Sequence, residues 1–325
     1  MKALVACKLF TAALVALSVS SSIGLCQTFP TKAMRIVVPR APSGTTDLLA
    51  RTVAQKLTEA WGQPVVVENR PGAGGNIGTE FVARSQPDGY TMLMAINSHT
   101  VNASFNDKLP YDPFKDFQPL ILVATSPNVL VSHPSLPANT VQGLIKLAKA
   151  KPGELTYGSG GSGSGSHLAG VLFANMAGIK LVHVPYKGMT PGIIDLIGGQ
   201  ISLCFAAIGV VYPHVQTGKL KGIAVTSLKR SPQLPAMPTV SEAGLKGFDV
   251  TSWFGLLLPA NTPKDIVAKL NAEIARITRL NEVQQKLSSQ GVDLVGDSPQ
   301  QFAAFMQADA AVWDKVIKAA GIRAE

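Results

Sequence analysis

LTYGSGGSGSGSHLAGVLFANMAG, residues 155–178, predicts a short strand, a glycine/serine loop and an amphipathic helix in succession. The helix is expected to begin near Ser166 and His167, directly after the loop. Such a junction directs backbone N–H groups, serine hydroxyls and the positive end of the helix dipole into one small volume. The stretch therefore predicts an anion-binding site.

A dinucleotide site is the main alternative for the same loop. Gly158, Gly160 and Gly163 match the G-x-G-x-x-G fingerprint between a strand and a helix, which would make the protein an NAD(P)-dependent oxidoreductase. That motif needs an acidic side chain about 20 residues later to bind the ribose hydroxyls. The next apolar run, Lys180–Val184, is followed by Pro-Tyr-Lys-Gly and no acid. A linker that binds nothing is a further alternative, which the packed helix behind the loop disfavours.

The first 26 residues have the pattern of an export signal peptide. Their apolar segment, Leu9–Val19, follows two lysines and is too short to span a bilayer. Gly24 and Cys26 occupy the small-residue positions of a cleavage site, so the mature chain is expected to begin near residue 27. Acylation of Cys26 is the weaker alternative, because Leu25 stands where lipoprotein signals have a small residue.

The composition of the chain after the signal peptide excludes several classes of protein. The remainder has 27 basic and 20 acidic residues, a net charge of +7, and a single cysteine, Cys204, in an apolar context typical of a core. An exported chain without disulfides is typical of a bacterial periplasm. The basic residues form no run or aromatic-interleaved stripe, so we expect no nucleic-acid partner, and the charge instead favours acidic small molecules. No later segment predicts a membrane span.

Strands and helices alternate along most of the chain, first over Met34–Ala95 and again over Glu154–Thr226. This pattern predicts an α/β fold with a mostly parallel sheet covered by helices on both faces. Two long extended segments, Phe117–His133 and Phe248–Pro259, bracket the second series. We therefore expect the chain to cross twice between two domains.

The crossings divide the mature chain into residues 27–124 and 251–325 for the first domain and 125–250 for the second. Hinges are expected near Ala124–Thr125 and Val250–Thr251. The loops that follow the strands should then face each other across a cleft, where ligands of such sheets bind.

Two of these loops carry further polar groups. The loop Pro39–Asp47 also opens a helix, and its Gly44 and two threonines can donate N–H groups and hydroxyls to an anion, although Asp47 alone is better explained as an acid that stabilises the first turn. Ser98 and His99 follow another predicted strand. No motif ties His99 to a nucleophile or a carboxylate, so it is interpreted as a satisfied polar residue rather than a general base. The G-x-S-x-G, H-E-x-x-H and Walker A motifs are absent, and the sequence does not predict an enzyme.

Several blocks, in order along the chain, resemble the tripartite tricarboxylate transporter substrate-binding proteins, the Bug (Bordetella uptake gene) receptor family. The blocks are Thr28–Lys32, Gly44–Arg51, Glu68–Gly75, Asp88–Thr91, Tyr157–Leu168, Pro185–Gly188 and Asp195–Gln200. The resemblance implies a periplasmic binding protein type II fold, in which two α/β domains close on a small carboxylate for a membrane permease. A ligand-sensing receptor for a signalling partner is a further alternative.

The resemblance also implies how the ligand is held. The loops at Ser43–Asp47 and Ser159–His167 would converge on its carboxylate, partly through water, with 186–188 and 206–208 as further cleft walls. We expect a monomer without cofactor, metal or catalytic residues. The expected ligand-binding residues are Arg40, Ser43, Gly44, Thr45, Thr46, Asp47, Ser98, His99, Ser159, Gly161, Ser162, Gly163, Ser166, His167, Tyr186, Lys187 and Ala207.

Three positions depart from the family's usual residues. Arg40 stands where phenylalanine or tyrosine is usual, Ser43 where glycine is usual, and Val171 replaces a common glutamate. If Arg40 projects into the cleft, its guanidinium can fork two N–H donors onto a second carboxylate, which predicts a preference for dicarboxylates. The alternative is an Arg40 that extends into solvent or pairs with an acid at the rim.

Overall fold

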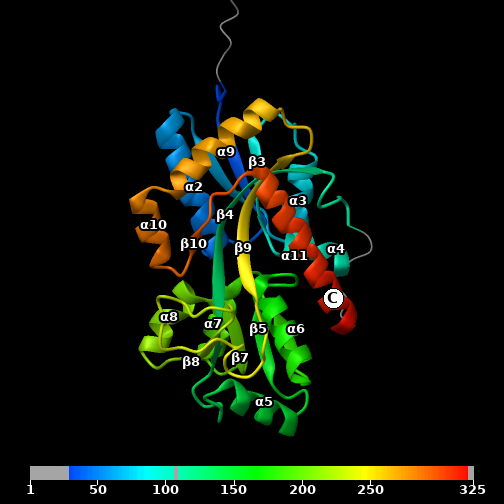
Figure 1. Cartoon of the computed structure of the whole chain (residues 1–325), viewed down its shortest axis with the longest axis vertical. Helices are drawn as coiled ribbons and strands as arrows, with labels where there is room; N and C mark the ends of the chain where they lie inside the picture. The colour runs from blue at the N-terminus through cyan, green and yellow to red at the C-terminus, as the bar shows by residue number, and fades with distance from the viewer. Residues whose placement is uncertain (1–28, 106–108, 321–325) are drawn as a thin grey trace, which may run out of the picture. The chain divides into compact units, whose positions relative to one another are not determined.

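The computed structural model describes residues 29–105 and 109–320, and the predicted signal peptide with Cys26 lies outside them (Figure 1). Within the described residues, no helix combines the length and hydrophobicity that a membrane crossing requires. The elements are β1 (Met34–Val38), α2 (Thr45–Trp61), β2 (Val65–Asn69), η1 (Ala73–Gly75), α3 (Asn76–Ala83), β3 (Thr91–Ile96), α4 (Ser98–Phe105), β4 (Phe117–Ser132), α5 (Val141–Ala150), β5 (Thr156–Ser159), α6 (Gly165–Ala177), β6 (Val182–Pro185), α7 (Met189–Ile197), β7 (Leu203–Ala207), α8 (Ile208–Gln216), β8 (Lys221–Val225), β9 (Thr251–Pro259), α9 (Lys264–Thr278), α10 (Asn281–Ser288), β10 (Asp293–Leu294) and α11 (Pro299–Ala320).

Ten strands form one sheet, in which the order β2-β1-β3-β9-β4-β7-β5-β6 is completed by β8 and β10, both paired with β4. Strands β1, β2 and β3 are parallel to one another, and so are β5, β6 and β7. We call β1–β3 with their helices the first half of the fold and β5–β8 with theirs the second half. The predicted α/β fold is confirmed.

Strands β4 and β9 join the two halves (Figure 1). They pair antiparallel with each other along the whole of β9 and along residues 117–127 of β4, from Phe117 opposite Pro259 to Pro127 opposite Thr251. β9 also pairs antiparallel with β3, and β4 with β7. The prediction of a mostly parallel sheet is therefore wrong at the centre, because the two crossing strands run in opposite directions. The division into two separate domains stays a prediction.

Apolar runs explain where the core lies. β1 is apolar except for the exposed Arg35, and its Ile36, Val37 and Val38 are fully buried, as expected for a central strand covered on both faces. Cys204 on β7 is also fully buried, and burial raises the pKa of its thiol to about 12, which agrees with its interpretation as a core residue. The sequence analysis predicts no element at the residues of two helices, α4 and α5. Helix α4 begins with polar residues, which hide its helical pattern.

The C-terminal helix α11 is attached to the first half by a half-buried carboxylate, and it lies beside β9 and α4 in Figure 1. Oδ2 of Asp309 accepts hydrogen bonds from Thr100 Oγ1 at 2.6 Å and Trp253 Nε1 at 3.0 Å, and Oδ1 accepts one from Trp313 Nε1 at 3.1 Å. Burial raises the pKa of Asp309, although these three donors oppose the shift. One side chain thus connects α4, β9 and α11.

Candidate anion-binding site

Loops from both halves enclose a cavity of about 390 Å³. The loop after β1 and the loop after β5 face each other across it, and the junctions β6–α7 and β7–α8 complete the wall. Eight of the residues predicted from the sequence line this cavity. They are Arg40, Ser43, Gly44, Thr45, Thr46, Ser166, Lys187 and Ala207.

Four helices begin at the cavity. Their N-cap residues, Gly44 of α2, Ser164 of α6, Gly188 of α7 and Ala207 of α8, all line it. Of these four helices, only α6 has a capping side chain among the described residues, where Ser164 Oγ accepts a hydrogen bond from the backbone N–H of His167. The first turns of α2, α7 and α8 therefore keep N–H donors that no capping side chain satisfies, and their dipoles place positive potential at the cavity.

Arg40 is the charged group deepest in this wall. Its Nη2 donates to Ser98 Oγ at 3.1 Å and its Nη1 to Gly160 O at 3.4 Å, while its Nε is buried without a hydrogen-bond partner among the described residues. Burial lowers the pKa of Arg40 to about 10, so the guanidinium still carries its charge at neutral pH. Within residues 29–105 and 109–320, no carboxylate pairs with it. Arg40 therefore lines the cavity, and its orientation toward a ligand stays a prediction.

The charges around the cavity have one sign. Arg40 and the exposed Lys187 line it, and in the part of the chain that the structure describes no aspartate or glutamate does. That part also holds no cluster of histidine, cysteine or acidic side chains able to bind a metal. The arrangement suits an anionic ligand and offers no anionic group that would repel it.

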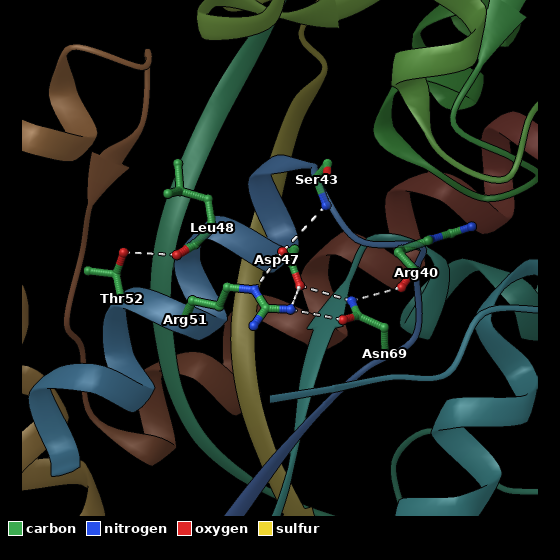
Figure 2. Close-up of polar contacts among 7 residues, drawn as sticks. All are labelled: Arg40, Ser43, Asp47, Leu48, Arg51, Thr52 and Asn69. Carbon is green, nitrogen blue, oxygen red and sulfur yellow. Dashed lines mark hydrogen bonds and ion pairs between the residues drawn. The ribbon is translucent and has the colours of Figure 1, made fainter. Parts of the chain in front are cut away.

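Asp47 lies behind the wall of the cavity rather than in it. Figure 2 shows its carboxylate between Ser43, Arg51 and Asn69, with the side chain of Arg40 pointing away from it. Asp47 accepts hydrogen bonds from Arg51 Nε at 2.9 Å, Asn69 Nδ2 at 2.9 Å and the backbone N–H of Ser43 at 3.4 Å. Asn69 Nδ2 also donates to the carbonyl of Arg40 at 3.1 Å. The acid thus holds both ends of the loop that carries Arg40.

We expect an Asp47→Asn variant to lose about 1–2 kcal/mol of unfolding free energy at neutral pH, because an amide cannot accept from all of these donors. Burial alone would raise the pKa of Asp47, but the hydrogen bonds from Arg51, Asn69 and Ser43 outweigh it, and the pKa is lowered. The contribution of Asp47 is therefore complete above the unfolded-chain pKa of about 4 and is lost as pH falls through the lower folded pKa.

Urea denaturation from neutral pH to pH 3 measures this dependence, and the gap between wild type and Asp47→Asn should narrow in acid. Asp265 is a matched control, since it occupies the first turn of α9 but is exposed. If Asp265→Asn loses the same free energy of unfolding, the effect comes from the helix dipole and not from the hydrogen bonds that Asp47 accepts.

Ser43 has a backbone conformation that favours glycine, with φ of 73°. Its carbonyl accepts a hydrogen bond from Thr190 Oγ1 of the second half at 3.2 Å, so the turn also contacts the opposite wall. Because the side chain is exposed, we expect Ser43→Gly to stabilise the fold by about 1 kcal/mol. Ser43→Ala retains the Cβ and should give no gain in thermal denaturation. Equal stability of the two variants would contradict strain at this position.

The other predicted residues do not line the cavity. Ser98 contacts it only through Arg40. His99 is buried in the first half, where its Nε2 donates to Pro113 O at 2.8 Å and its ring packs against Phe117, and burial lowers its pKa to about 4. Tyr186 turns away and donates its hydroxyl to Asp195 at 2.6 Å.

Four more of the predicted residues that do not line the cavity bond to one another within the glycine/serine loop. They are Ser159, Gly161, Gly163 and His167. Ser159 Oγ accepts from the backbone N–H of Gly161 at 3.1 Å, and His167 Nδ1 accepts from that of Gly163 at 3.1 Å. Burial and the neighbouring His183 lower the pKa of His167 to about 3, so it is a neutral acceptor. Ser162 is half-buried outside the lining.

Several lining residues were missed from the sequence. The crossing strands provide Asn128 on β4 and Ser252 and Phe254 on β9, and Asn97 precedes α4. Asn97 directly precedes Ser98 and His99, which the sequence singles out. The residues of β4 and β9 carry no local signal, because only the pairing of the two strands brings them to the cavity.

Comparisons with known proteins agree with this geometry. A family model described as "Tripartite tricarboxylate transporter family receptor" matches residues 49–322. The protein BugT of Bordetella pertussis is 35% identical over 298 residues, which cover 91% of each chain. The solved structure of R. palustris Rpa4515 with adipate is 38% identical, with a TM-score of 0.87 over 91% of this chain and 100% of that one. MatC (Rpa3494) from Rhodopseudomonas palustris with bound malate is 31% identical, with a TM-score of 0.84 over 89% of this chain and 100% of that one.

Proposed function

The chain belongs to the tripartite tricarboxylate transporter family of receptors, and from this membership we propose that it captures a small organic carboxylate in the periplasm and delivers it to a membrane permease. Receptors of this family are periplasmic solute-binding proteins and not an enzyme class. We propose that this chain likewise acts without catalysis and as a monomer. The oxidoreductase and signalling alternatives receive no support from the family match.

One observation carries the proposal. Arg40 lines the cavity and its buried Nε has no hydrogen-bond partner among the described residues, and three helix N-termini without a capping side chain surround the cavity. A carboxylate accepts such donors well, since charged hydrogen bonds contribute about 1.5–3 kcal/mol each. A neutral ligand would leave the charge of Arg40 uncompensated in a site where burial already costs free energy.

We further propose that the ligand is a dicarboxylate. The helix N-termini suit one carboxylate and the guanidinium of Arg40 suits a second. Adipate and malate, which accompany the two solved relatives, are both dicarboxylates. The bonds Arg40–Gly160 and Thr190–Ser43 join the two halves at the cavity, and we propose that ligand binding favours this closed arrangement through hinges near residues 124–125 and 250–251.

Isothermal titration calorimetry tests the proposal directly. The purified protein, freed of carried-over ligand by unfolding and refolding, is titrated with dicarboxylates, tricarboxylates, aromatic acids, acidic amino acids and NAD(H). We expect saturable binding of at least one carboxylate at micromolar or tighter affinity and none of NAD(H). Conversion of a bound acid to a product, or binding of the nucleotide in place of the acids, would contradict the receptor proposal.

A further inference from the structure

We infer that Asn128 is a specificity-determining residue of this receptor, whose side chain binds a hydroxyl group on the carbon next to a ligand carboxylate. The receptor then prefers a 2-hydroxy acid to the same acid without the hydroxyl, and to the same acid with an amino group in its place. This inference rests on the proposed function and narrows the class of acid. It comes from one buried side chain in the cavity wall.

Asn128 has a fixed place in that wall. It lies on β4, one of the two crossing strands, lines the cavity and is only 4% exposed. Its backbone N–H donates to Thr226 Oγ1 at 2.9 Å, and its carbonyl accepts from the backbone N–H of Thr226 at 2.9 Å. Its Nδ2 donates to Ser252 Oγ at 3.3 Å. These bonds orient the side chain before a ligand arrives, as a recognition group requires.

The amide oxygen of Asn128 has no partner. Within residues 29–105 and 109–320, no hydrogen bond reaches Oδ1. The unpartnered side-chain atoms of those residues that are fully enclosed are Arg40 Nε, His99 Nδ1 and Ser132 Oγ. Oδ1 is not one of them, so it keeps accessible surface, and because the residue is otherwise buried this surface opens into the cavity. An acceptor in this position favours a donor from the ligand.

A carboxylate cannot supply that donor, because its oxygens only accept. Three other side chains of the wall, Ser43, Thr45 and Thr46, also have hydroxyls that form no hydrogen bond within the described chain. A hydroxyl differs from Oδ1, since it can rotate its O–H toward a carboxylate and donate. Asn128 Oδ1 therefore needs an O–H or N–H group on the body of the ligand.

The charge of the wall favours a hydroxyl over an ammonium group. Arg40 and Lys187 line the same cavity, and no aspartate or glutamate of the described chain does. An ammonium group on the ligand would be repelled by both cations and would find no anionic partner in the wall. A hydroxyl carries no charge and both donates and accepts, so it can pair with either end of the Asn128 amide.

Strand pairing indicates where the hydroxyl lies on the ligand. Asn128 is opposite Ala207 of β7, and Ala207 is the N-cap residue of α8. Paired residues on neighbouring antiparallel strands are about 5 Å apart. A carboxylate bound at the first turn of α8 would therefore place its adjoining carbon beside Asn128, and a 2-hydroxy acid has its hydroxyl on that carbon.

Isothermal titration calorimetry with acids that differ at one carbon tests this inference. Succinate, malate and aspartate form one series, and glutarate, 2-hydroxyglutarate and glutamate form a longer one, with both enantiomers of each chiral acid. In the better-binding series, we expect one enantiomer of the hydroxy acid to bind at least fivefold more tightly than the plain acid and the amino acid, because it offers Oδ1 a neutral donor.

Equal or weaker binding of the hydroxy acid would show that water suffices for Asn128, and would overturn the inference while the receptor proposal stands. Binding of other acids of the wider panel, with none from either series, would have the same meaning. Failure of every acid would overturn both.

Two substitutions of Asn128 give a second test. Asn128→Leu removes the hydrogen-bonding groups at similar volume and should bring the hydroxy acid and the plain acid to equal affinity. Asn128→Asp retains an acceptor but adds a negative charge, so it should weaken all the acids and shift the preference toward the amino acid. Circular dichroism checks that both variants fold. A folded Asn128→Leu that keeps the wild-type ratio of the two affinities would overturn the inference, as would an unchanged order of the three acids in Asn128→Asp.

Asn97→Leu is the matched control, because Asn97 lines the same cavity but both ends of its amide are bonded. Its Oδ1 accepts from the backbone N–H of Trp253 at 3.2 Å, and its Nδ2 donates to Thr251 O at 3.4 Å. We expect this variant to lower the affinity for all the acids and to keep their ratio. Loss of the ratio in Asn97→Leu as well would assign the preference to the shape of the wall and not to Asn128.

Discussion

An Arg40→Phe variant should bind dicarboxylates at least tenfold more weakly than the wild-type protein, and a monocarboxylate of similar size nearly as well. Arg40 is half-buried and is the less exposed of the two cations in the described part of the cavity wall, and its Nε has no hydrogen-bond partner there. A partly desolvated charged hydrogen bond contributes about 1.5–3 kcal/mol, and 1.4 kcal/mol corresponds to one decade in affinity. Phenylalanine restores the residue type that is usual in the family, so the loop should accommodate it.

Isothermal titration calorimetry of the wild type and of Arg40→Phe, each with a dicarboxylate and a monocarboxylate, measures the difference in affinity. Arg40→Lys separates charge from geometry, since lysine retains the charge but cannot offer two parallel N–H donors. Arg84→Phe is the matched control, because Arg84 lies on the surface in a pair with Glu80, far from the cavity lining. If wild type and Arg40→Phe bind every diacid equally, Arg40 has no part in recognition and the dicarboxylate proposal fails.

The largest loss of stability is expected from an Asp309→Asn variant, about 2–4 kcal/mol of unfolding free energy. Both carboxylate oxygens act only as acceptors, from Thr100, Trp253 and Trp313. In either orientation, the amide would place its NH₂ against a buried indole N–H, and an unpaired buried donor costs about 1–3 kcal/mol. The bond to Trp253 also stabilises β9 beside Asn97, so the effect should extend to the cavity.

Guanidinium denaturation gives the free energy, and titration of a bound acid reports any change at the cavity. Asp314→Asn on the same helix is the matched control, since Asp314 forms an exposed pair with Lys318 and should tolerate the change without measurable loss. A loss for Asp309→Asn no larger than for Asp314→Asn would show that this carboxylate does not hold α11 in place.

The regular elements could be predicted from the sequence wherever local pattern determines structure. The strand predicted at Met34–Val38 and the helices predicted at Thr45–Trp61 and Pro299–Ala320 have the bounds of β1, α2 and α11, because a largely apolar run or a helical stripe of apolar residues defines each of them. Helix α4 could not be predicted in this way. Its first residues, including His99 and Thr100, are polar yet buried, and they are stable there only because Pro113 and Asp309 bind them from distant parts of the chain.

The residues of the candidate site likewise fall into those that a local sequence pattern predicts and those that only contacts between distant parts of the chain bring to the cavity. The glycine/serine loop and the loop after β1 were predicted because a strand, a glycine-containing turn and a helix follow one another locally. Asp47 shows the limit of this reasoning, since sequence position places it with the ligand loop but its partner Asn69 lies in β2 and turns it away from the cavity. Asn128 and Ser252 meet only through the pairing of two strands more than a hundred residues apart.

The paired strands β4 and β9 also have a mechanical consequence. Two strands that are hydrogen-bonded to each other resist sliding past each other but bend more readily perpendicular to the sheet. We therefore expect the pair to act as an elastic hinge. Their register shifts between Pro119 and Ile121 and again between Leu122 and Ala124, and irregularities of this kind bend and twist a paired strand locally. We expect the paired strands to bend elastically at this stretch, rather than to rotate freely about a loop. After a ligand is released, the two halves of the receptor should then return to one relative orientation, in which the cleft can bind the next ligand.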